Sequence, residues 1–140
     1  MGNHRHSRRG ANSIEFALTL PFYLFLVLGI MDFGYLYHIQ AGLDNAAATG
    51  CREGAKVDPN AGDPVSIASA SMATTAALFC NGDCVQSVQD LNTGQWEVPD
   101  RTIQCTITRT YTPLIGLVPQ PATLSSTSFQ RLEWQRNPAP

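Results

Sequence analysis

The sequence has little charge and no catalytic signature. Only 14% of its residues are charged, and the formal net charge is −2, so the chain lacks the basic surface that nucleic-acid binding requires. The patterns G-x-S-x-G, H-E-x-x-H, C-x-x-C and the phosphate-binding P-loop are absent from the sequence. We therefore expect a chain that is not an enzyme and takes no cofactor. Nucleic acid and small-molecule substrates are not expected partners.

Positive charge is concentrated at one end of the chain. Residues 1–10 contain Arg5, Arg8 and Arg9 and no acid, which leaves six basic against eleven acidic residues over 11–140. A basic tip on a mildly acidic body predicts two environments for one chain. His4 and His6 belong to the tip, so no histidine cluster for zinc is expected in the body.

An apolar run follows the basic tip. Phe16 to Met31 contains no charged residue, and a helix through Tyr37 would be about 33 Å long, enough to cross a bilayer. A buried core helix is one alternative, but the polar, small-residue remainder would not cover it on all sides. A cleaved secretory signal is another, but no A-x-A site follows Met31. We therefore predict a transmembrane helix over 11–37.

The orientation of this helix follows from the flanking charges. Because the arginines lie at its N-terminal end, residues 1–10 are expected to form a basic cytoplasmic leader. Tyr35 and Tyr37 suit the outer interface, where an aromatic ring is half wet. Residues 38–136 would then form a domain outside the cytoplasmic membrane, and 137–140 a disordered tail.

Three residues are unusual for a plain membrane anchor. Glu15 stands at the head of the apolar run, where a carboxylate is either solvated at the headgroups or paired with a partner. Pro21 removes a helical hydrogen bond to Ala17 and is expected to kink or loosen the helix. Asp32 is either a surface acid or a contact to a neighbouring subunit, and the sequence does not decide between the two.

The leader and the helix share one motif. Gly10 ends the basic leader, and Glu15-Phe16 follows five residues later, at the start of the apolar run. Further along come the strings Ala17-Leu18-Thr19-Leu20-Pro21, Gly29-Ile30-Met31-Asp32-Phe33-Gly34, and Gln40 to Ala47 through Arg52-Glu53-Gly54-Ala55. Together they resemble the TadE-like pseudopilins, minor pilins of the tight-adherence (Flp) type IV pilus system. Residues 103–114 and 124–133 resemble the closing strands of the same family.

The resemblance implies a function and a set of partners. A prepilin peptidase would cut between Gly10 and Ala11, and the chain would be required to assemble Flp pili for adhesion and biofilm formation. Gly10 leaves the backbone uncovered for the peptidase, and Glu15 can neutralise the new α-amino group of Ala11. The implied partners are the peptidase, a related pseudopilin, the major Flp pilin and the secretion ATPase platform. The alternative is an uncleaved single-pass anchor with a small interaction domain.

The remaining chain predicts an α+β fold of pilin-like shape. The membrane helix is expected to continue to about residue 56, since Leu36, Ile39, Leu43, Ala46, Ala47 and Gly50 recur at helical spacing. Small residues over 46–54 permit close helix packing. A second helix is predicted over 65–79, starting near Asp63 or Pro64, with Ile67, Ala70, Ala77 and Leu78 on its apolar face.

A short antiparallel sheet is expected to follow. Residues 101–111 alternate, with Ile103, Cys105, Ile107 and Tyr111 on the buried face. Residues 95–98 are its predicted neighbour, 113–121 a Pro/Gly-rich connection, and 123–134 a further strand.

Four cysteines lie after the membrane segment, in the compartment assigned as oxidising. They are Cys51, Cys80, Cys84 and Cys105. Disulfides that staple a small domain are the expected use, and three pairings are open. Cys80 can pair with Cys84 and leave Cys51 for Cys105, or either Cys80 or Cys84 can pair with Cys105.

Overall fold

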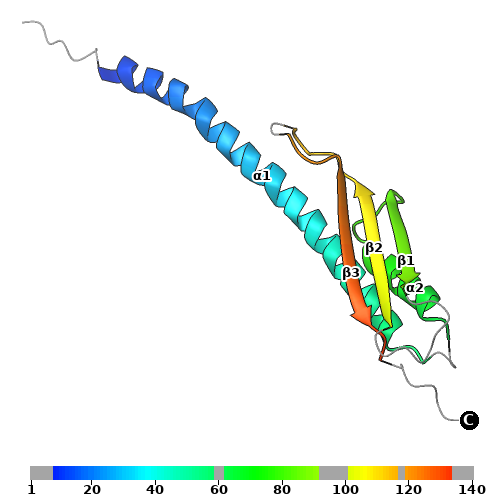
Figure 1. The fold of residues 1–140 in the computed structure, drawn as a ribbon. Helices are drawn as coiled ribbons and strands as arrows, with labels where there is room; N and C mark the ends of the chain where they lie inside the picture. The colour runs from blue at the N-terminus through cyan, green and yellow to red at the C-terminus, as the bar shows by residue number, and fades with distance from the viewer. Residues whose placement is uncertain (1–7, 59–61, 92–100, 117–118, 134–140) are drawn as a thin grey trace, which may run out of the picture. The chain divides into compact units, whose positions relative to one another are not determined.

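The computed structural model describes residues 8–58, 62–91, 101–116 and 119–133, and confirms the predicted α+β class. The elements are α1 (Arg8–Ala55), α2 (Pro64–Ala76), β1 (Cys84–Asp90), β2 (Thr102–Thr110) and β3 (Thr123–Arg131) (Figure 1). The chain forms two compact units. Unit 1 holds Met1–Leu36 and Pro113–Gln120, and unit 2 holds Tyr37–Thr112 and Pro121–Pro140.

The part of α1 in unit 1 is a helix of large apolar side chains that face outward. It continues through Pro21, whose missing N–H interrupts one backbone hydrogen bond. Among the described residues it is the one helix long and apolar enough to span a membrane, and none of its most apolar stretch is buried. Protein does not cover this surface, so the apolar side chains are available to lipid.

The part of α1 in unit 2 changes to small, buried side chains. Ile39, Leu43, Ala46 and Ala47 are buried on the face that the helical spacing predicted, and Gly50, Cys51, Gly54 and Ala55 continue it. The predicted helix end near residue 56 is also confirmed, since α1 ends at Ala55. This part of the helix therefore packs into the core of unit 2.

Two glycines of α1 allow α2 to approach closely. A Cβ at Gly50 would lie 2.7 Å from the Met72 Cβ, and one at Gly54 would lie 2.6 Å from the Ala68 Cβ. Because the two glycines are one helical turn apart, they form a flat strip for α2 to lie on. The close packing predicted for the small residues of 46–54 is confirmed.

The apolar face predicted for α2 is wrong. The buried residues are Pro64, Ala68, Met72 and Ala76, whereas Ile67 and Leu78 are exposed. The strip on α1 selects this face because only small or unbranched side chains fit against glycine at such short distances. The bulk of Ile67 would force the two helices apart.

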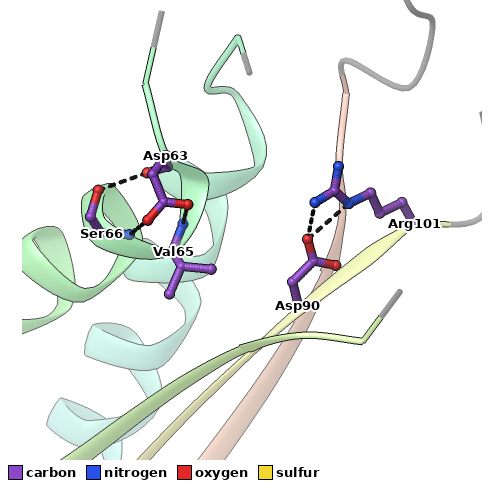
Figure 2. A network of polar contacts seen from close by, with 5 residues as sticks. All are labelled: Asp63, Val65, Ser66, Asp90 and Arg101. Atoms are coloured by element: carbon purple, nitrogen blue, oxygen red, sulfur yellow. Dashed lines mark hydrogen bonds and ion pairs between the residues drawn. The ribbon is translucent and has the colours of Figure 1, made fainter. Parts of the chain in front are cut away.

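α2 starts where the sequence predicts and ends earlier. Asp63 is its N-cap: its carboxylate accepts hydrogen bonds from the backbone N–H of Val65 (3.3 Å) and Ser66 (3.0 Å) (Figure 2). Pro64 occupies the first turn, where its missing N–H costs nothing. The helix ends at Ala76 rather than Phe79, and a turn leads to Cys80.

The sheet is antiparallel in the order β1-β2-β3. The predicted alternation of β2 is confirmed, since Ile103, Cys105 and Ile107 are buried on one face. α2 and the last turns of α1 lie on that face of the sheet (Figure 1). The strand predicted over 123–134 is confirmed as β3, which ends at Arg131. Leu124 and Ser126 are buried on its inner face.

On the side away from β3, β2 pairs with β1, a strand that the sequence did not indicate. The predicted neighbour over 95–98 lies outside the described residues. β1 turns Cys84, Gln86 and Val88 toward the core and Val85 toward solvent, so its apolar residues do not alternate. A strand without that alternation gives no signal of period two.

Disulfides close unit 2. Cys51 of α1 is bonded to Cys105 of β2, with a Cα–Cα distance of 5.7 Å, and Cys80 is bonded to Cys84 across the turn before β1. This is one of the pairings that the sequence left open. The first bond joins residues 54 apart in the sequence and fixes the helix to the centre of the sheet, whereas the second spans only 4.

Replacing Gly54 with Ala is expected to destabilise unit 2. The new methyl group would meet the Ala68 Cβ and, at 2.8 Å, the backbone oxygen of Pro64. Overpacking costs about 1–3 kcal/mol, which outweighs the gain of about 0.5–1 kcal/mol from replacing a helical glycine. The measurement is the midpoint of thermal unfolding in detergent, with Gly34→Ala as the control because its Cβ meets nothing within 4 Å. Equal midpoints for both variants would contradict the close packing.

Removing the two disulfides is expected to have unequal effects. Loop-closure entropy gives about 4 kcal/mol for a separation of 54 residues and about 2 kcal/mol for a separation of 4. The double variant Cys51→Ser/Cys105→Ser should therefore lose about twice the free energy of unfolding lost by Cys80→Ser/Cys84→Ser, as measured by urea denaturation. A larger loss for the Cys80–Cys84 pair would show that the long-range bond is not the main constraint.

Candidate functional site

The predicted processing segment lies at the start of α1. Because α1 begins at Arg8, the bond between Gly10 and Ala11 falls in its first turn. The side chains of residues 8–12 lie outside those that the structure describes. The first four N–H groups of a helix have no partner within it, and helix ends fray. The first turn of α1 can therefore open at little cost.

Glu15 is exposed on α1. Among the described residues its carboxylate has no hydrogen-bond or ion-pair partner. The Thr19 hydroxyl instead donates to the backbone oxygens of Glu15 (3.0 Å) and Phe16 (3.2 Å). The carboxylate thus remains available to a cation from another group.

Outward-facing apolar side chains continue from this point along α1. They include Ile14, Phe16, Leu18, Phe22, Tyr23, Phe25, Val27, Ile30, Met31, Phe33 and Tyr37. They lie on all sides of the helix rather than along one stripe, which is typical of a helix surrounded by lipid.

Asp32 is the buried carboxylate of unit 1. Its side chain is fully buried and accepts three hydrogen bonds: from the backbone N–H of Ile115 and of Gly116, and from Nε2 of Gln120, each at 3.2 Å. The sequence left its role open between a surface acid and a contact to a neighbouring subunit. The surface acid is wrong, because Asp32 is buried and binds the β2–β3 connection of its own chain. The contact to a neighbouring subunit stays a prediction.

The backbone geometry of the connection explains how it donates hydrogen bonds to the Asp32 carboxylate. Gly116 has a φ of +71°, a conformation that favours glycine, and this lets two successive N–H groups point to the same acceptor. A bare carboxylate at a bilayer centre costs about 2.5–3.5 kcal/mol on insertion scales. Three donors offset part of that cost, and the carboxylate in turn satisfies two backbone N–H groups of a loop.

Sequence reasoning missed the partners of Asp32. Ile115, Gly116 and Gln120 follow it by more than 80 residues, and only the turn character of the Pro/Gly-rich connection was visible. The available signal was a carboxylate in an apolar run, which requires a partner somewhere. No periodicity of the sequence indicates which segment supplies that partner.

Two ion pairs lie at the ends of the β1–β2 pair in unit 2. Arg101 donates to the Asp90 carboxylate, joining the end of β1 to the start of β2 (Figure 2). At the other end Arg109 Nε lies 3.0 Å from Asp83 Oδ2, and this hydrogen bond lowers the pKa of Asp83 below its usual 3.8. Both pairs are internal to the sheet. The described residues contain no group of three or more His, Cys, Asp or Glu side chains that could hold a metal ion.

These features define an α+β chain with a candidate membrane helix at its N-terminus. Residues 10–52 match the family model described as TadE-like protein. The predicted resemblance is therefore confirmed over the segment that holds Gly10, Glu15 and Asp32. The resemblance predicted for 103–114 and 124–133 lies outside the match and stays a prediction. No curated protein and no solved structure matches the chain.

Proposed function

We propose that this chain is a TadE-like minor pilin or pseudopilin that a prepilin peptidase processes and that takes part in assembling tight-adherence pili. The observation that carries the proposal is the match of residues 10–52 to the TadE-like family, together with Glu15, which stands five residues after Gly10 and has no partner among the described residues. The family suggests a role in tight-adherence pilus systems. The protein would act as a peptidase substrate and a structural or priming subunit, not as an enzyme.

The proposed location is the cytoplasmic membrane of a bacterium. α1 can cross it once, with the basic residues 1–10 on the cytoplasmic side and unit 2 in the periplasm. The two disulfides of unit 2 support an oxidising compartment for that part of the chain. The proposed partners are the prepilin peptidase, a related pseudopilin, the major Flp pilin and the secretion ATPase platform.

The alternative is an uncleaved single-pass anchor whose outer domain binds some other partner. The exposed apolar helix and the disulfides would serve that protein equally well. The two functions differ at the bond between Gly10 and Ala11, and at the use of the Glu15 carboxylate.

Gly10→Lys is expected to block processing without blocking membrane insertion. A long charged side chain would cover the backbone next to the bond, while the apolar run remains intact. N-terminal sequencing of membrane-extracted protein should give Ala11 for the wild type and the leader for the variant. Gly2→Lys is the matched control, since it adds the same charge away from the bond. Wild-type protein that keeps its leader in a host with the peptidase would favour the uncleaved anchor.

Glu15→Gln is expected to impair assembly while leaving insertion and processing largely normal. The substitution keeps the shape and removes the charge that would pair with the Ala11 amino group once lipid and neighbouring helices exclude water. The measurement is the yield of sheared pili and of co-purified pilins. Glu53→Gln is the control, because this exposed residue of α1 forms only an exposed pair with Lys56. Wild-type piliation in the Glu15→Gln variant would contradict the pairing role and would indicate that Glu15 is only a solvated residue at the lipid headgroups.

A further inference from the structure

The turn over residues 113–116 presents apolar side chains that the described residues cover only in part. Leu114 and Ile115 are 62% and 43% exposed, and Pro113 and Gly116 are also exposed. The turn belongs to unit 1, the same compact unit as the apolar part of α1. Exposed apolar residues grouped on a turn indicate an interaction surface.

Hydrogen bonds fix the level of this turn along α1. The N–H groups of Ile115 and Gly116 lie 3.2 Å from the two carboxylate oxygens of Asp32. Any environment that surrounds α1 at Asp32 therefore also meets the turn. Met31 and Phe33, the neighbours of Asp32 on α1, are exposed apolar residues as well.

The level of Asp32 in a bilayer follows from the helix rise. α1 is helical throughout, so Asp32 lies about 25 Å along the axis from Glu15. A hydrocarbon core of about 30 Å that begins at Glu15 extends past Asp32. The turn would then lie just inside the core, in the leaflet farther from Glu15.

We propose that residues 113–116 form a second membrane contact, in which Leu114 and Ile115 enter the acyl chains of that leaflet and Asp32 holds the turn there. Irregular backbone is tolerated at such a depth only where its polar groups are satisfied. Asp32 satisfies two N–H groups of the turn, and Pro113 has none. The proposal rests on α1 spanning the membrane, but not on processing or pilus assembly.

The test is the depth of a spin label at Leu114→Cys in the full chain, with one copy per phospholipid nanodisc. All four native cysteines are bonded, so the new thiol is the only free one to label. Collisions with oxygen should exceed those with a water-soluble nickel chelate, as at Leu26→Cys in the apolar helix. Val85→Cys, an exposed apolar position on β1, should show the reverse order.

The role of Asp32 is tested by repeating the Leu114 measurement with Asp32→Ala. Collisions with the nickel chelate should rise several-fold toward the Val85 value. Asp32→Asn should give a smaller rise, because its amide oxygen can still accept part of the hydrogen bonds that the carboxylate accepts. Asp44→Ala, which removes an exposed carboxylate from α1, should cause no change.

Two results would overturn the proposal. One is a Leu114 label as accessible to water as the Val85 label, while the Leu26 label stays in lipid. That result would leave the membrane anchor and the proposed function intact. If the Leu114 label were then protected from water only in assembled pili, the turn would contact a neighbouring subunit instead of lipid. The other is a lipid-embedded Leu114 label that both Asp32 substitutions leave unchanged.

Discussion

The small side chains between Ala46 and Gly54 allow α1 to pack closely into the core of unit 2. Gly50 and Gly54 have no Cβ to keep α2 away, so Ala68 and Met72 lie directly against the α1 backbone. Cys51, on the same stretch, is bonded to the central strand. Close packing along this stretch and the long-range disulfide therefore add to the stability that the apolar core of unit 2 provides.

The same helix has a different surface in unit 1. Its large apolar side chains are exposed, and its two carboxylates differ in burial and in hydrogen bonding. Asp32 is buried with three donors from its own chain, whereas Glu15 has no partner among the described residues. Asp32 already has three donors, so of these two carboxylates Glu15 is the one that would pair with another subunit in the function proposed above.

Sequence reasoning succeeded where one residue pattern determines one structure. The charge-free run predicts a candidate membrane helix, the small residues after it predict a closely packed helix, and the alternation over 102–110 predicts a half-buried strand. It failed where a second element decides. The buried face of α2 depends on the glycine strip of α1, and β1 is a strand because β2 offers it an edge.

The Asp32 contact shows why part of the candidate site could not be read from the sequence. An acidic residue in an apolar run indicates that hydrogen-bond donors must lie nearby in the fold. For Asp32, two of the three donors are backbone N–H groups. Backbone donors exist at nearly every residue, so residue identity does not reveal which will be used. Among the described residues of the connection, Gly116 stands out by its positive φ, and a glycine in a Pro/Gly-rich segment does not by itself indicate that conformation. Contacts made through backbone geometry therefore become visible only when the fold is known.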